Sequence, residues 1–245
     1  MHPRPEVRVF DDAAALARAA AALVVEEALA AAARGVFRLV LCGGRTPKAL
    51  FFLLAGPAGV GLPWERTHVF FSDERHVPPT HPESNVRLVR DLLLDRVPVP
   101  KEQVHAMPVG GSPDDDARRH EDELRRHFAG ASPSFDLALL GLGEDGHTAS
   151  LFPDSPALEE KTRWVLAVRG PKPPYARLTM TFPLLDAARH AVLLVSGEGK
   201  AGPLRALLDV SAEPRTLPAA LLRPSRRLSV LADRDAAQDI PSSRS

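Results

Sequence analysis

An apolar run that ends in a glycine-rich loop limits most tightly how this chain can fold. Residues 137–140 read Leu-Ala-Leu-Leu, and the loop that follows, residues 141–147, holds three glycines, two acids and a histidine. A short, continuous apolar run is typical of a β-strand that is buried on both faces of a parallel sheet. Glycines allow a loop backbone to approach a ligand closely. The stretch therefore predicts a ligand site at the carboxyl end of a central strand.

The loop carries a candidate catalytic pair, Asp145 and His147. A carboxylate two residues from an imidazole can hold it in one tautomer and raise its basicity, which suits a general base. A purely structural turn, with an incidental histidine, stays open from this stretch alone.

The same loop matches the dinucleotide fingerprint G-x-G-x-x-G at Gly141, Gly143 and Gly146. That fingerprint also requires a long following helix and an acidic residue at the end of the next strand. Pro153 cuts the following segment short, and the next expected strand ends in Arg169. Both observations argue against a nicotinamide-binding loop.

A second candidate site follows the strand expected over residues 36–41. Its sequence is Gly43-Gly44-Arg45-Thr46-Pro47, and a helix is expected over residues 48–54. We expect Thr46 to cap this helix and Pro47 to occupy its first turn, so that free backbone amides and the Arg45 charge attract phosphate. The P-loop spacing is absent. An ordinary capped turn is the alternative.

Two further strand exits carry charge. The strand expected over residues 68–72 leads into a loop that starts with Asp73, Glu74 and Arg75, which are either functional or simply solvated. The strand expected over residues 190–195 leads through a glycine-bearing turn to Lys200, directly before a helix over residues 201–208.

Expected strands alternate with expected helices along the chain. Further strands are expected over residues 7–10, 164–168 and 228–232, and residues 178–182 fit either a strand or the approach to a helix near Leu184. This alternation predicts a doubly wound, mostly parallel α/β sheet with helices on both faces. We expect one domain over residues 1–237 and a disordered tail over residues 238–245.

Composition excludes several classes of function. Lysine plus arginine equals aspartate plus glutamate at 31 each, and no basic stripe with interleaved aromatic residues is present, which argues against nucleic acid as a partner. The single Cys42 suits a reducing compartment. The absence of a leader-like start and of a long apolar run predicts a soluble, cytoplasmic protein.

Neither a metal nor a cofactor is expected. A helix is expected over residues 114–128, in which His120 and His127 lie two turns apart, too far to share a metal easily, and we expect both on the surface. No ligand spacing is visible elsewhere. Nothing indicates an obligate assembly, so a monomer is favoured.

Taken together, these motifs resemble the 6-phosphogluconolactonase family, whose modified Rossmann fold is shared with glucosamine-6-phosphate deaminase and ribose-5-phosphate isomerase. The resemblance covers nearly the whole chain. The matching pieces are residues 43–47, 72–75, 77–78, 84–85, 141–143, 145–153, 177–179 and 199–201.

The resemblance implies hydrolysis of 6-phospho-D-glucono-1,5-lactone to 6-phosphogluconate, in the oxidative pentose phosphate pathway, with His147 as general base. We expect Asp145 or Asp73 to orient His147 and Arg75 to stabilise the oxyanion. The expected substrate- and phosphate-binding residues are Gly43, Gly44, Arg45, Thr46, Asn85, Gly143, Arg177 and Lys200.

Two functions other than lactone hydrolysis are compatible with this resemblance. The related deaminases carry a glutamate five residues after the motif histidine, where this chain has Phe152, and a tyrosine where it has Arg75. Phenylalanine cannot exchange a proton, which disfavours a deaminase. A sugar-phosphate-binding regulator without turnover would usually have lost the histidine that this chain keeps.

Overall fold

The computed structural model describes residues 5–209 and 215–240 and contains a seven-stranded sheet. All neighbouring strands in this sheet run parallel, in the order β1-β10-β9-β6-β2-β3-β5. Its strands are β1 (Glu6–Phe10), β2 (Phe37–Leu41), β3 (Thr67–Phe71), β5 (Val104–His105), β6 (Phe135–Gly141), β9 (Ala188–Val195) and β10 (Arg227–Asp233). The expected doubly wound, mostly parallel α/β fold is confirmed.

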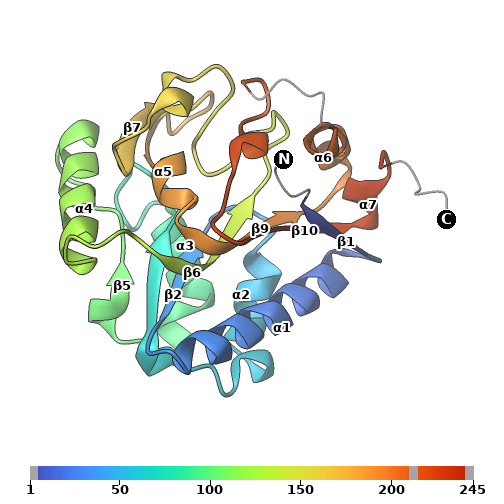
Figure 1. The fold of residues 1–245 in the computed structure, drawn as a ribbon, viewed down its shortest axis with the longest axis horizontal. Helices are drawn as coiled ribbons and strands as arrows, with labels where there is room; N and C mark the ends of the chain where they lie inside the picture. The colour runs from blue at the N-terminus through green and yellow to red at the C-terminus, as the bar shows by residue number, and fades with distance from the viewer. Residues whose placement is uncertain (1–4, 210–214, 241–245) are drawn as a thin grey trace.

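Helices cover both faces of this sheet (Figure 1). They are α1 (Ala13–Ala32), α2 (Lys48–Leu54), α3 (Asn85–Leu92), α4 (Pro113–His127), α5 (Phe182–Leu185), α6 (Ala201–Leu208) and α7 (Arg234–Ala237). The helices α1, α2 and α3 pack on one face, and α4 to α7 pack on the other. The central strand β6 is buried along nearly its whole length, as its apolar sequence predicts.

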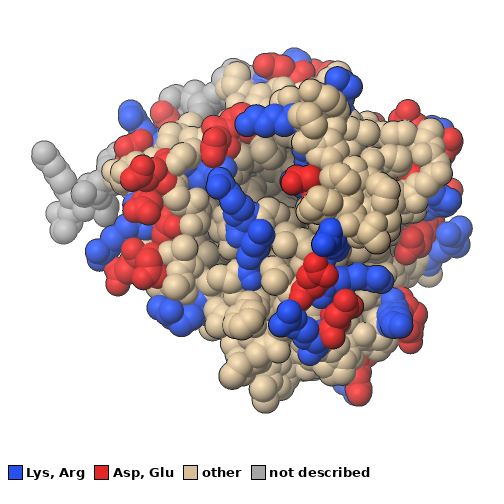
Figure 2. All heavy atoms as spheres, turned by 180° about the vertical axis from the view of Figure 1, so that it is seen from behind, with Lys and Arg blue, Asp and Glu red and all other residues tan. Residues whose placement is uncertain are grey.

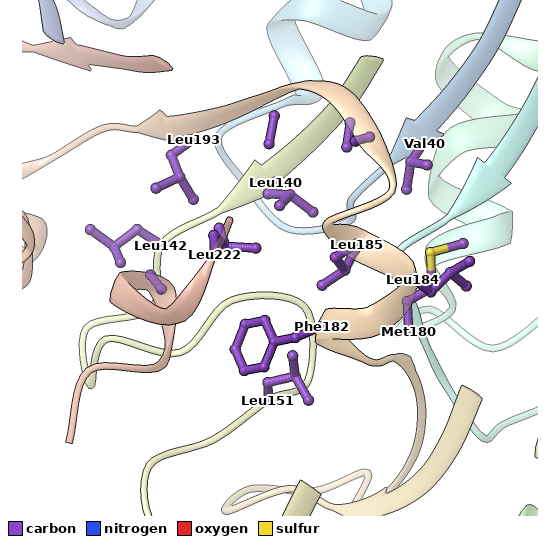
Figure 3. Close-up of a cluster of buried hydrophobic side chains, with 14 of the residues drawn as sticks. Val40, Leu140, Leu142, Leu151, Met180, Phe182, Leu184, Leu185, Leu193 and Leu222 are labelled. Atoms are coloured by element: carbon purple, nitrogen blue, oxygen red, sulfur yellow. The ribbon is translucent and has the colours of Figure 1, made fainter. Parts of the chain in front are cut away.

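Each face of the sheet has its own apolar core. On the face of α1, residues such as Leu16 and Val24 meet Leu39 and Leu139 of the sheet. On the other face, Leu140, Leu193 and Val40 point toward α5 and its neighbours, where Phe182 packs near Leu151 (Figure 3). Alternate residues of one strand serve opposite cores because side chains alternate across a strand.

A small antiparallel sheet lies on the second face, corrects one expectation and decides a segment that the sequence left open. It consists of β4 (Asp73–Arg75), β8 (Ala176–Met180) and β7 (Val165–Arg169), in that order. The segment starting at Asp73, expected to be a loop, begins with a strand, because its backbone pairs with β8. The ambiguous segment near residue 180 supplies both β8 and the short helix α5.

Side-chain caps mark several helix starts. Asp12 accepts a hydrogen bond from the amide of Ala15, and Ser84 accepts one from the amide of Arg87. Thr46 was expected to cap α2, but this is wrong. Pro47 holds the N-cap position and no side chain caps that helix.

The expectation that His120 and His127 lie on the surface is also wrong for His120. Their shared face is the inner face of α4, so His120 is fully buried, and His127 is half-buried at the end of the helix. Seven-residue spacing identifies a common helix face but not which way that face points.

The end of the described chain is a turn. Residues 238–240 follow α7, and Ile240 packs against the core, whereas the rest of the expected tail lies outside the described residues. Within the described ranges, no helix has the length and apolar character needed to cross a membrane.

Candidate active site

A cavity of about 500 Å³ opens where four adjacent strands of the main sheet, β9, β6, β2 and β3, end. Loops far apart in the sequence meet there, because the carboxyl ends of parallel strands share one edge of the sheet. All the predicted site residues except Asp145 line it: Gly43, Gly44, Arg45, Thr46, Asp73, Arg75, Asn85, Gly143, His147, Arg177 and Lys200. The structure therefore brings the proposed anion-binding loop and the imidazole into one cavity.

Asp145 does not line the cavity itself but forms a hydrogen bond with His147, which does. The Asp145 Oδ1 atom lies 2.5 Å from His147 Nδ1 and also accepts the His147 amide at 3.2 Å. Burial opposes ionisation of Asp145, but the hydrogen bonds from His147 outweigh it and lower the pKa of that carboxyl. An ionised Asp145 accepts the proton on Nδ1, which leaves Nε2 as the proton-accepting nitrogen.

Two glycines make room for polar side chains at this edge. A Cβ on Gly143 would lie 2.0 Å from His147 Nδ1, and one on Gly43 would lie 1.8 Å from Asn85 Oδ1. Neither distance is compatible with a side chain. These glycines are required because the imidazole and the amide rest directly on the backbone.

Asp73 is held by hydroxyl and amide groups and has no described bond to His147. Its Oδ2 accepts from Ser150 Oγ at 2.7 Å, and Oδ1 accepts from Ser72 Oγ at 3.2 Å and from Asn85 Nδ2 at 3.4 Å. Of the two carboxylates considered for orienting His147, only Asp145 makes the contact within the described residues. These hydrogen bonds instead hold the Asp73 carboxyl group in a fixed position on the cavity wall.

Two arginines that also line the cavity face each other across the small sheet. Arg75 of β4 is the register partner of Arg177 of β8. Burial lowers the pKa of Arg177, and the like charge of Arg75 adds to the effect. The Arg75 Nη1 atom donates to the backbone oxygen and the carboxylate of Glu83, at 2.9 and 3.1 Å. Adjacent like charges of this kind would be relieved by a bound anion.

Lys200 completes the cationic part of the cavity. It ends the short 3₁₀ turn Glu198–Lys200 before α6, and burial lowers its pKa. Arg45, on the second loop, is close enough to contribute to the same lowering. The cations therefore come from the segments that follow β2, β3 and β9 and from strand β8 of the small sheet.

Glu74 stabilises the local fold, a role that its place in the sequence beside Asp73 did not predict. Its carboxylate accepts from the amides of Arg75, Asn85 and Val86, at 2.6, 2.7 and 2.8 Å, and from the Ser84 hydroxyl at 3.0 Å. It thereby ties β4 to the start of α3. Of the three charged residues after β3, two reach the cavity and one holds the fold.

Several cavity residues had not been predicted as catalytic or binding residues from the sequence. They are Ala13, Cys42, Pro47, Ala49, Gly141, Leu142, Ala149, Leu194, Ser196 and Gly197. Cys42 and Ser196 directly follow β2 and β9, so position at a strand exit was the available signal. Burial raises the pKa of Cys42 to about 12, so this thiol stays protonated.

The surface of the protein has a local hollow, as expected of a site for a small molecule rather than for an extended ligand. The face turned away in Figure 1 is hollowed near its centre, and lysine and arginine side chains border the hollow (Figure 2). Elsewhere on this face, acidic and basic side chains are interspersed.

Comparison with known proteins assigns the family. A sequence model described as glucosamine-6-phosphate isomerases/6-phosphogluconolactonase matches residues 11–231. The chain belongs to this family.

Relatives within the family support the assignment. The 6-phosphogluconolactonase of Synechocystis sp. is 44% identical over 215 residues, covering 86% of this chain and 88% of the relative. The human 6-phosphogluconolactonase is 41% identical over 228 residues, covering 89% and 86%. The crystal structure of 6-phosphogluconolactonase from Thermotoga maritima has a TM-score of 0.83 at 27% identity, covering 94% of this chain and 100% of that chain.

Proposed function

We propose that this protein hydrolyses 6-phospho-D-glucono-1,5-lactone to 6-phosphogluconate, with His147 as the general base. The observation that carries the proposal is the joint presence of the Asp145–His147 pair and a cluster of cations around one cavity. The relatives are 6-phosphogluconolactonases, which supports the same substrate for this chain.

The Asp145–His147 pair has the features that are required to activate a water molecule. With Nδ1 bonded to Asp145, Nε2 takes the proton of a water as that water attacks the lactone carbonyl. Asp145 then stabilises the imidazolium that forms. When the bond between the carbonyl carbon and the ring oxygen breaks, the imidazolium returns its proton to that oxygen, which leaves the free hydroxyl and the carboxylate of 6-phosphogluconate. Proton transfer to a positioned imidazole contributes about 10²- to 10⁴-fold to the rate.

The cations supply the two other functions that the reaction requires, which are binding of the phosphate and stabilisation of the oxyanion. Arg45, Arg177 and Lys200, with the amides of the Gly43–Gly44 turn, hold the phosphate at one end of the substrate. Arg75, beside Asp73 on the cavity wall, stabilises the oxyanion at the carbonyl. Phosphate binding remote from the reacting carbon fixes the lactone ring in position.

The reaction needs no covalent intermediate. A lactone is an activated ester, so water is a sufficient nucleophile once a base is present. Three lining side chains carry a thiol or a hydroxyl, Cys42, Thr46 and Ser196, and none has an imidazole partner among the described residues. Cys42 is a protonated thiol, and Ser196 Oγ donates to Asp233 at 2.5 Å.

Phe152 favours the lactonase over the deaminase activity found in the same family. Its ring lies 4.8 Å from the ring of His147, centroid to centroid. An apolar ring at this point supports the imidazole by packing and cannot exchange a proton with it. Sugar-ring opening assisted by a carboxylate at this position is therefore disfavoured.

The experiment is a lactone hydrolysis assay corrected for the spontaneous reaction. We expect His147→Gln to lower kcat by about 10²- to 10⁴-fold while 6-phosphogluconate still binds. Lys161→Gln, at an exposed position that does not line the cavity, is the control and keeps the parent rate. Parent-like hydrolysis by His147→Gln would refute the assignment of the base.

A second variant tests the direct attack by water. Cys42→Ala removes the buried thiol from the cavity wall, and we expect kcat to stay within about twofold of the parent. Loss of turnover in this variant, with binding of 6-phosphogluconate intact, would instead indicate a covalent thioester.

A further inference from the structure

Three histidines meet at the sheet edge formed by β3 and β5, outside the cavity described above. His68 belongs to β3, His105 to β5, and His127 is the last residue of α4. One ring nitrogen from each lies within 4.8 Å of the others. His68 stands four residues before Ser72, roughly 13 Å along an extended strand, so this cluster is distant from the carboxyl edge.

The ring nitrogens of the cluster face one another. The Nδ1 atom of His68 lies 3.0 Å from Nε2 of His105. The Nε2 atom of His127 is buried and has no hydrogen-bond partner among the described residues. The rings also pack closely, with centroids 5.4 Å apart for His68 and His105 and 4.6 Å apart for His105 and His127.

Glu123 supports the cluster from outside. Its Oε1 atom lies 3.1 Å from Nδ1 of His105, on the opposite side of that ring from His68. A metal-bound imidazole commonly donates its second nitrogen to a carboxylate, which fixes the tautomer and strengthens the ligand. Glu123 is therefore placed as such a carboxylate would be.

The charged groups around the cluster have opposing effects on the binding of a cation. Burial lowers the pKa values of His68 and His127 to about 4, and the neighbouring His105 and Arg38 contribute, so both rings are neutral near pH 7. Metal binding requires the neutral ring. Glu123 favours a cation nearby, whereas Arg38 opposes it; buried His120 lies beside Glu123, at 3.4 Å.

We propose that His68, His105 and His127 bind a divalent transition-metal ion of the zinc type. Three imidazoles with one further position for water are a common zinc ligand set. Bonds of about 2.0–2.1 Å in a tetrahedron place ligand nitrogens roughly 3.4 Å apart. The 3.0 Å pair is already near this value. A nitrogen of His127 lies within 4.8 Å of both partners, so the site requires this ring to shift toward the pair when the ion binds.

The ion would strengthen the weakest edge of the sheet. The edge strand β5 has two residues, and its register with β3 consists of Val69 with Val104 and Phe70 with His105. A metal held by β3, β5 and α4 joins all three elements directly. The role is structural, since the catalytic cavity lies at the other end of β3.

The test uses the full chain without a histidine tag, stripped with EDTA and titrated with ZnCl₂ by calorimetry at pH 7.5. We expect one ion per chain, and a visible absorption band of tetrahedral type when Co²⁺ replaces Zn²⁺. His68→Gln and His127→Gln should each weaken binding more than about 100-fold, and Glu123→Gln about 10- to 100-fold.

Two controls keep the result decisive. His147→Gln removes the imidazole in the catalytic cavity and should bind zinc as the parent does; lactone hydrolysis by the cluster variants shows that they are folded. The proposal fails if the parent binds no zinc. It also fails if His147→Gln abolishes binding that His68→Gln retains, because the ion then occupies the catalytic cavity.

Discussion

The imidazole of His147 rests on the backbone of Gly143, whose Cα hydrogen occupies the direction in which any side chain would meet the ring. A Cβ there would lie 2.0 Å from Nδ1 of His147 and 2.5 Å from Oδ1 of Asp145. One glycine thus permits both the position of the base and its bond to the carboxylate.

Replacement of that glycine should separate activity from folding. In Gly143→Ala the added methyl group displaces the imidazole, and we expect kcat for lactone hydrolysis to fall at least about 100-fold. Gly202→Ala, in α6 with open space around it, is the matched control. Circular dichroism and kcat measured on both variants check this, and full activity in Gly143→Ala would contradict it.

Loss of the Asp145 charge should slow the chemical step. Asp145→Asn keeps the shape of the side chain but no longer stabilises the imidazolium, so we expect kcat to fall about 10²- to 10⁴-fold with KM little changed. Asp154→Asn serves as the control, because asparagine tolerates the positive φ of 57° at that position. Equal kcat values for the two variants would remove Asp145 from the mechanism.

Arg177 should contribute to binding through the substrate phosphate. Arg177→Gln removes one charge-assisted contact, and we expect KM for the phosphorylated lactone to rise roughly 10- to 100-fold. Glucono-1,5-lactone without phosphate is the internal control, since its kcat/KM should change little. An equal loss with both lactones would assign Arg177 to the reacting carbon instead.

Asp186 should make stability depend on pH. Burial raises its pKa to about 6 from a usual 3.8, although its Oδ1 accepts the Arg223 amide at 2.6 Å. The folded state therefore binds more protons than the unfolded state between about pH 4 and pH 6, so stability falls as pH rises through this window.

Asp186→Asn keeps the acceptor and removes the charge. We expect it to gain about 1 kcal/mol over the parent at pH 7, allowing for the solvent screening of a partly exposed group, and nothing at pH 4. Urea unfolding at both values measures the difference. Asp122→Asn, at an exposed position of α4, is the control, and a pH-independent gain for Asp186→Asn would contradict the explanation.

Local patterns in the sequence determined much of the parallel framework. The apolar run of β6, the caps Asp12 and Ser84, and the glycine-rich strand exits act over a few residues, so their consequences can be read without knowing the rest of the fold. Parallel strands place their carboxyl ends at one edge of a sheet, so the loop of residues 43–47 and the loop that carries His147 line the same cavity.

The tertiary structure alone decided the contacts between distant residues. The sequence offers both Asp73 and Asp145 as the carboxylate that orients His147. In the structure the hydroxyls of Ser150 and Ser72 hold Asp73. The gathering of His68, His105 and His127 was equally hidden, since their separations along the chain follow no local period. Such contacts depend on strand register and on which face a helix turns inward, and packing of the whole chain fixes both.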